Sequence, residues 1–136
     1  MVRQFFQSIR LYLHRNGKFY GLSISQLGFV PRNKGLYRLA LLHKSASRIT
    51  SNGVVLNYER LEFLGDAVLG AIVAELLYKF FPNQDEGFLT RVRSKVVSRE
   101  SLNDLAIHIG LNKAVVAKAD LSRNKHIYGD VFEAFV

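Results

Sequence analysis

Residues 58–69 read YERLEFLGDAVL, and they place acidic residues inside a segment that is otherwise apolar enough to be buried. Glu62 and Asp66 are four positions apart, so on a helix both carboxylates leave the same face, roughly 5–6 Å apart at their Cβ atoms. An unpaired carboxylate is costly to bury and takes up a proton unless a cation neutralises it. The spacing therefore indicates either a cation site or a pair of acids in salt bridges with Arg60 or Lys79.

A second acidic pair lies further along the chain, where residues 128–136 read YGDVFEAFV. Asp130 and Glu133 are three positions apart and again have apolar neighbours. Two helices that face each other would offer all four carboxylates to one pocket. Oxygen ligands of this kind favour Mg²⁺, with Mn²⁺ as a substitute, over zinc, which prefers nitrogen and sulfur ligands that the sequence does not supply in a recognisable pattern.

Both acidic segments resemble the ribonuclease III family. Residues 59–69 are similar to the signature of its endonuclease domain, and further matching pieces follow the family's order along roughly residues 35–136. These pieces are LHKSAS at 42–47, FPN at 81–83, EGFL at 86–89 and GDVFEA at 129–134. The resemblance implies that the catalytic and metal-binding residues are Glu62, Asp66, Asp130 and Glu133.

The family further implies an activity, an assembly and a set of partners. A bacterial-type ribonuclease III is a helical protein that works as a two-fold homodimer. It hydrolyses double-stranded RNA to 5′-phosphate and 3′-hydroxyl ends during rRNA and mRNA processing, with Mg²⁺ and no small-molecule cofactor. Glu59 and Glu86 are expected as auxiliary acids of the site. The alternatives are that Glu59 only interacts with the helix dipole and that Glu86 is only a solvated acid in a loop. Phe63 is expected to contact the partner subunit; the alternative is that it belongs to the core of its own chain.

Two features of the sequence bear on the extent of the resemblance. Residues 113–127 are shorter than the corresponding family segment and lack its Gly-rich, Glu-containing stretch, which puts an RNA contact there in doubt. A helix that carries half of a metal site is expected to continue for several turns beyond Glu133. We therefore expect the sequence to be a fragment, and in this family a double-stranded-RNA-binding domain often follows.

The charge balance indicates a polyanionic partner. The chain has 136 residues, with 19 Lys and Arg against 11 Asp and Glu, a net charge of +8 and a pI near 10.0. Residues 1–50 hold nine of the basic residues and no acid, and residues 1–34 are interpreted as a basic N-terminal arm. Such an excess is typical of proteins that bind nucleic acid or anionic membranes. A basic face is predicted to contact RNA phosphates, with a solvated helix face as the alternative, at Arg91, Arg93, Lys95 and Arg99.

Composition also limits the compartment and the class of protein. The absence of cysteine excludes disulfides and thiolate metal sites, and no run of 18 apolar residues clear of charges indicates a transmembrane span. We expect a cytoplasmic protein without a membrane partner. An amphipathic helix over residues 5–13 leaves an organelle-targeting segment or an interfacial helix as alternatives.

Periodicity predicts an all-α domain with one buried central helix. That helix is expected from Tyr58, capped by Asn57, to near Phe81, because Pro82 follows. It is apolar on nearly every side, which favours burial. Loops are expected at 51–53 and 120–126. Other helices are expected over 36–45, with Tyr37 on the solvent side, over 88–97, with Val96 inward, over 98–109, with Gly110 as its stop, and from Tyr128 or Asp130.

Two other functions fit the same residues. One is a compact family member that trims ribosomal RNA and has no RNA-binding domain. The other is an RNA- or ribosome-binding module of the same fold that does not cleave. Metal-dependent cutting of duplex RNA distinguishes the enzyme from the binding module.

Overall fold

The computed structural model describes residues 33–121 and 126–136. Nearly all of them belong to the second of the chain's two units, Gly35–Val136. The helix expected over residues 5–13 lies outside the described residues. The elements, in chain order, are α3 (Lys34–Ala40), η1 (Lys44–Ala46), β1 (Arg48–Ile49), β2 (Val55–Leu56), α4 (Glu59–Phe80), α5 (Glu86–Val96), α6 (Arg99–His108), η2 (Leu111–Lys113) and α7 (Ile127–Phe135).

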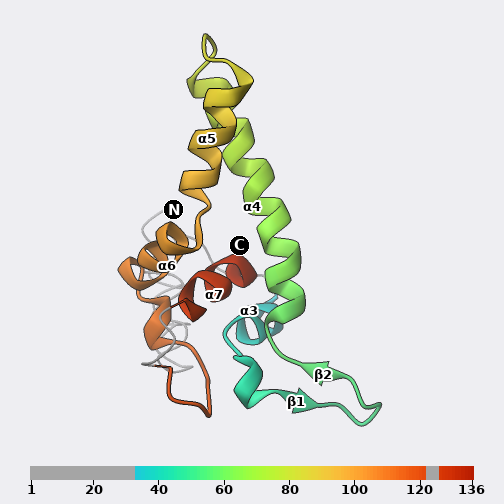
Figure 1. Cartoon of the computed structure of the whole chain (residues 1–136). Helices are drawn as coiled ribbons and strands as arrows, with labels where there is room; N and C mark the ends of the chain where they lie inside the picture. Colours follow the sequence, from blue (N-terminus) through green and yellow to red (C-terminus); the bar gives the residue numbers. More distant parts are fainter. Residues whose placement is uncertain (1–32, 122–125) are drawn as a thin grey trace, which may run out of the picture. The chain divides into compact units, whose positions relative to one another are not determined.

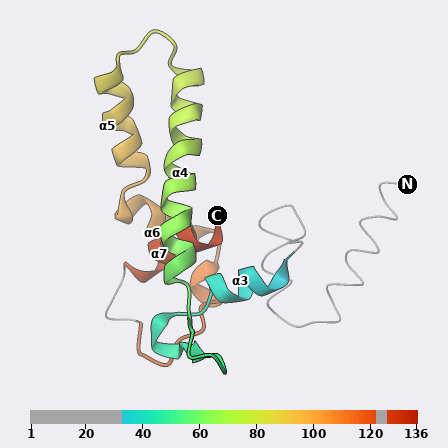
Figure 2. The ribbon, with the colours of Figure 1, turned by 90° about the vertical axis from the view of Figure 1, so that its right-hand side faces the viewer.

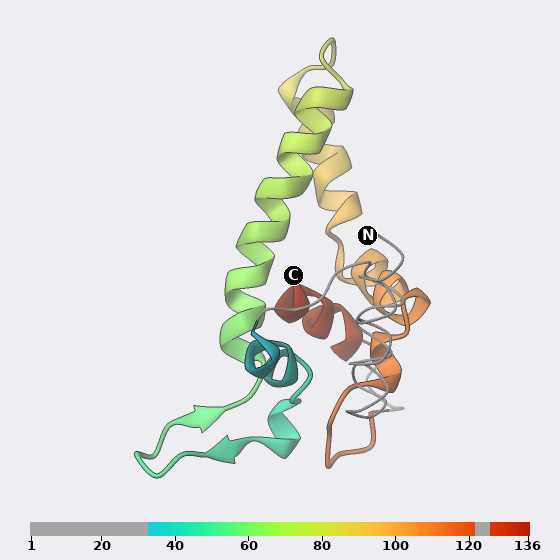
Figure 3. The same ribbon diagram turned by 180° about the vertical axis from the view of Figure 1, so that it is seen from behind.

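Helix α4 organises the second unit. It runs antiparallel to α5, and α7 lies between α6 and the N-terminal half of α4 (Figures 1, 2 and 3). The helix begins at Glu59, one residue later than predicted, and its N-cap residue is Tyr58 rather than the predicted Asn57. Asn57 still contributes to the start of the helix, because its Oδ1 accepts a hydrogen bond from the Glu59 N–H at 3.0 Å. Its end at Phe80, two residues before Pro82, agrees with the prediction.

The core lies where α7 meets α6 and the 40–42 segment. Val131 on α7 and Ala106 on α6 are fully buried, and Leu41 and Leu111 close the same core from either side. Ser98 caps α6 by accepting a hydrogen bond from the Ser101 N–H. Gly110, which follows α6, has the left-handed conformation that stops a helix, at φ 82°. The predicted start and stop of this helix are therefore confirmed.

The predicted burial of α4 is wrong for the single chain. Gly65, Val73 and Leu77 are the residues of α4 that are buried. A row at four-residue intervals is exposed instead, because α5 and α7 cover the other side of the helix; we call it the α4 stripe, and it consists of Leu64, Val68, Ile72 and Leu76. In the described part of the chain, no helix combines the length and the apolarity needed to span a bilayer.

Three other local predictions need correction. The helix predicted over 36–45 ends at Ala40, because Leu42 leaves it to form a parallel bridge with Val116. Tyr37, predicted on the solvent side, is half-buried, because its ring packs edge-on against Phe135 with ring centroids 4.9 Å apart. Val96, predicted to point inward, is exposed. None of the other residues of α5 is buried either.

The remaining differences concern short elements and the last helix. Strands β1 and β2 pair antiparallel in the registers Arg48↔Leu56 and Ile49↔Val55, and the predicted loop at 51–53 is the turn between them. These short strands are an addition to a domain that is otherwise helical, as predicted. Helix α7 begins at Ile127, one residue before the earlier of the two predicted starts.

Candidate functional site

Two glycines allow α7 to approach both α4 and α6. A Cβ atom added at Gly65 on α4 would lie 1.7 Å from the backbone oxygen of Glu133, so the two helices touch through their backbones at this point. A Cβ atom at Gly129 on α7 would lie 3.2 Å from the backbone oxygen of Arg99 at the start of α6. Because Glu62 precedes Gly65 by one turn, the close crossing brings the acidic residues of α4 and α7 together.

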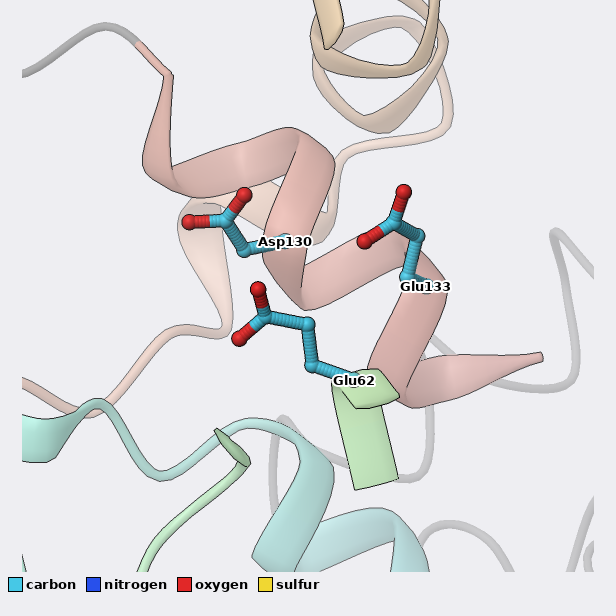
Figure 4. A group of neighbouring side chains, drawn as sticks. All are labelled: Glu62, Asp130 and Glu133. Atoms are coloured by element: carbon cyan, nitrogen blue, oxygen red, sulfur yellow. The ribbon is translucent and has the colours of Figure 1, made fainter. Parts of the chain in front are cut away.

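Three of the four predicted acids converge. Glu62 projects from α4 and Asp130 and Glu133 project from α7 into the same space (Figure 4). Each offers one carboxylate oxygen, and these oxygens lie within 4.8 Å of one another. We call these residues the acidic triad. Asp66 is exposed and does not belong to it, although its negative charge acts on Glu133.

The geometry of the acidic triad fits a small divalent cation with oxygen ligands. Two oxygens bound at roughly 2.1 Å to a six-coordinate ion are at most about 4.2 Å apart, and the three oxygens here all lie within 4.8 Å of one another. The donor set contains carboxylates from two different helices and no sulfur or imidazole. The arrangement can therefore hold a metal ion of the class that prefers oxygen.

The positive charge near the acidic triad does not offset the burial of its carboxyls. Burial raises the pKa of Glu133 to about 7, and the nearby charges of Asp66, Asp130 and Glu62 add to the rise. Burial also raises the pKa of Glu62, helped by Asp130 and Glu59. The pKa of Asp130 is raised by burial, in spite of the opposing charges of Arg99 and Lys44. A divalent cation would supply the missing charge and lower all three pKa values.

In the metal-free protein, raising the pH from 5 to 8 should lower the free energy of unfolding by about 1–2 kcal/mol through Glu133. The pKa of this carboxyl is about 7 in the folded protein against an ordinary 4.5, so the folded state holds the proton more tightly than the unfolded state. The contribution is full below the unfolded pKa and is lost as the pH rises through the folded one. Urea unfolding in EDTA at several pH values measures it.

The control for this pH dependence is Glu133→Gln, which removes the titrating group. The pKa values of Glu62 and Asp130 are also raised, and these carboxyls change the stability with pH as well, so the comparison between the two proteins isolates Glu133. The variant should lose less stability than the original protein over the same pH range. Identical slopes in the two proteins would contradict the raised pKa.

Sequence reasoning missed two cations beside the acidic triad. Arg99, which we predicted to contact RNA, lies with its Nε atom 3.9 Å from Asp130 Oδ1. Lys44 acts on Glu62 and on Asp130 through its positive charge. A signal for Lys44 was present, since it belongs to the LHKSAS segment that resembles the family. The signal for Arg99 was its position in the helix predicted over 98–109, apart from the helix over 88–97 that carries Arg91, Arg93 and Lys95.

The LHKSAS segment packs against the start of α4 and against residues 116–119. His43 is buried against the ring of Tyr58, with ring centroids 5.6 Å apart, and its Nδ1 accepts a hydrogen bond from the Ser45 N–H at 3.1 Å. Burial and the neighbouring Lys44 lower the pKa of His43. Ser45 Oγ accepts hydrogen bonds from the backbone N–H groups of Lys118 and Ala119. The segment thereby ties residues 116–119 to the start of α4.

The two expected auxiliary acids occupy different places. Glu59 lies in the first turn of α4, accepts a hydrogen bond from Asn57 Nδ2 at 3.1 Å and acts on Glu62 through its charge. Glu86 begins α5 and accepts a hydrogen bond from Thr90 Oγ1 at 2.7 Å. Because α5 runs antiparallel to α4 (Figure 2), the start of α5 adjoins the end of α4, and Glu86 does not reach the acidic triad of its own chain.

The remaining predicted residues are exposed. Phe63 is 83% exposed and protrudes from α4, which rules out a core position in the single chain. Arg91, Arg93 and Lys95 all lie on the solvent-accessible surface of α5. Arg93 also lines a cavity of about 370 Å³ between α4 and α5. The structure thus separates the basic residues of α5 from Arg99.

Comparisons with known proteins agree with the resemblance seen in the motifs. A family model described as Ribonuclease-III-like matches residues 33–136. The chain is 44% identical to Ribonuclease 3 of Azobacteroides pseudotrichonymphae over 136 residues, which is 100% of this chain and 52% of that protein. The chain spans about half the length of the curated relatives that it matches.

Solved structures extend the likeness to the fold. The nuclease domain of ribonuclease III from Campylobacter jejuni superimposes with a TM-score of 0.71 at 31% identity, covering 85% of this chain and 78% of that one. A second structure of that domain, described as flexible in a region involved in dimer formation, gives a TM-score of 0.70 at 32% identity and covers 83% of this chain and 78% of that one.

Proposed function

The chain belongs to the ribonuclease III family, and on that premise we propose that it is the nuclease domain of a Mg²⁺-dependent endoribonuclease that cuts double-stranded RNA. The observation that carries the proposal is the acidic triad, in which Glu62 from α4 meets Asp130 and Glu133 from α7. Products would carry 5′-phosphate and 3′-hydroxyl ends. The protein would act in rRNA and mRNA processing in the cytoplasm.

Each acid has a role in this proposal. Glu62, Asp130 and Glu133 would hold Mg²⁺, directly or through water, because Mg²⁺ keeps much of its hydration shell. Asp66 would act from the edge of the site, where its charge reaches Glu133. When bound, the cation would supply Lewis acidity that makes water a better nucleophile and stabilises the charge developing at the phosphate. Glu133, whose pKa is about 7 without metal, would give up its proton on binding.

Recognition of the substrate would depend on phosphates rather than bases. Duplex RNA has a deep, narrow major groove, so proteins read it mostly through its shape, its 2′-hydroxyls and its backbone. Arg91, Arg93 and Lys95 present three exposed cations on α5, and residues 1–50 carry nine further basic residues without an acid. These residues would neutralise RNA phosphates.

The test uses labelled duplex RNA with the purified 136-residue chain in Mg²⁺ and in EDTA. The proposal expects cutting in Mg²⁺, none in EDTA, and product 5′ ends that a phosphate-dependent exonuclease can degrade. Tight RNA binding without cutting at any Mg²⁺ or Mn²⁺ concentration would instead identify the non-cleaving binding module. Cutting that persists in EDTA would contradict the metal-dependent mechanism.

We also propose that the α4 stripe is the interface of a two-fold homodimer. Leu64, Val68, Ile72 and Leu76 form a continuous exposed apolar row, and an uncovered row of this kind marks an interaction surface. Phe63 protrudes beside it, and a cavity of about 200 Å³ opens next to it, lined by Leu36, Tyr37 and Val68 among others. Phe63 of one subunit would fill this cavity in its partner, so that two sites cut the two strands.

Ile72→Asp should weaken such a dimer about a hundredfold, because two-fold symmetry buries each new carboxylate without a partner on both subunits. Analytical ultracentrifugation over a range of concentrations measures the dissociation constant. The matched control is Ile107→Asp on α6, because Ile107 is 44% exposed and Ile72 is 43% exposed. An equal effect of both substitutions, or a dimer unchanged by Ile72→Asp, would contradict the interface.

A further inference from the structure

Arg99 is a cation that the fold places beside the acidic triad. It is the first residue of α6, directly after the capping residue Ser98, and its backbone oxygen lies 3.2 Å from the position that a Cβ atom at Gly129 would take. The backbone of Arg99 is therefore fixed against the helix that carries Asp130. Its side chain is 67% exposed, and the Nε atom lies 3.9 Å from Asp130 Oδ1.

The positive charge of Arg99 acts on the whole acidic triad. It lowers the pKa of Asp130, of Glu62 and of Glu133 against the raising effect of burial. Lys44 acts in the same direction on Glu62 and Asp130, and His126 and His43 do so on Asp130. Arg99 thus acts on all three carboxyls of the acidic triad, and its Nε atom also lies within ion-pair distance of Asp130.

We propose that Arg99 is the resident counter-ion of the acidic triad, and that it competes with the incoming divalent cation for Asp130. The inference rests on the proposed function. A guanidinium and a divalent cation repel each other, so both are not favoured at one carboxylate. The ion pair is loose and the side chain largely exposed, so Arg99 can turn away into solvent when a cation binds. The presence of Arg99 beside Asp130 would therefore lower the affinity of the acidic triad for the first divalent cation.

Direct Mn²⁺ binding tests this competition without any measurement of cleavage. Electron paramagnetic resonance of free Mn²⁺, titrated with the full 136-residue chain, gives the dissociation constant. Arg99→Gln should bind Mn²⁺ about fivefold more tightly, because one repulsive charge is removed. Arg99→Lys keeps the charge and should stay within about twofold of the original protein.

The matched control is Arg48→Gln, which makes the same chemical change at an exposed residue of β1 and should leave the Mn²⁺ affinity unchanged. A circular dichroism melt of each variant confirms that it is folded. Unchanged or weaker Mn²⁺ binding by Arg99→Gln would overturn the inference while leaving the metal site intact. The absence of Mn²⁺ binding in every variant, including the original protein, would overturn the proposed function and the inference with it.

Discussion

Glu133→Gln is expected to reduce cleavage of duplex RNA at saturating Mg²⁺ by about a thousandfold or more. The substitution keeps the shape of the side chain but removes the charge that Glu133 would contribute to the cation, and metal-supplied stabilisation of the transition state is worth several kcal/mol. Glu133 belongs to the acidic triad together with Glu62 and Asp130 (Figure 4), so the substitution would leave the cation with one charged ligand fewer. Single-turnover cleavage rates measure the effect separately from product release.

The control for this loss is Glu75→Gln. Glu75 also lies on α4, but it is exposed and paired with Lys79 on the surface, so its variant should cleave at the original rate. The same preparations should be compared for Mn²⁺ binding, which Glu133→Gln is expected to weaken and Glu75→Gln to leave unchanged. Full activity of Glu133→Gln would show that the acidic triad is not where the reaction takes place.

The spacing within each acidic pair is visible in the sequence because it is local. Spacings of four and three along a helix determine which side chains share a face, and no information from elsewhere in the chain is needed. Whether the two helices meet is a different question, which only the family resemblance answered. The structure adds a distinction that spacing alone could not make, since Glu62 reaches the acidic triad and Asp66, one turn later, stays at its edge.

Burial was predicted less well, for a physical reason. Apolar periodicity shows that a surface prefers to leave water, but not whether its own chain covers it. On α4 the apolar pattern predicts burial on nearly every side, but Ile72 and the rest of the α4 stripe are exposed in the single chain. The same pattern fits an interface with a second subunit, which is why the proposed homodimer reconciles the sequence with the structure.

Charged residues show a further limit of local patterns. Arg99 follows Arg91, Arg93 and Lys95 closely in the sequence and was grouped with them as a basic face. The structure separates Arg99 from the other three residues, because Ser98 caps a new helix, α6. Arg99 therefore lies beside Asp130 of α7 and not along α5. The sequence predicts that a helix starts at residue 98, but the consequence of this start for the neighbouring arginine depends on the direction of α6 in space.

Gly65→Ala is expected to lower the free energy of unfolding by about 4 kcal/mol or to prevent folding, because a core overlap that cannot relax lies at the upper end of substitution effects. The new methyl group would lie 1.7 Å from the backbone oxygen of Glu133, and a backbone atom within a packed helix cannot move aside as a flexible side chain can. Typical domains have about 5–15 kcal/mol of stability in all. Urea unfolding followed by circular dichroism measures the change.

Gly70→Ala is the control on the same helix. A Cβ atom at Gly70 meets nothing within 4 Å, so this variant should be unchanged or more stable by up to about 1 kcal/mol, as alanine favours a helix over glycine. Equal stabilities of the two variants would show that α4 and α7 do not touch at Gly65. If instead a folded Gly65→Ala protein is recovered, α7 must have moved away from α4. It should then bind Mn²⁺ poorly, because the displacement that relieves the clash also carries Glu133 and Asp130 away from Glu62.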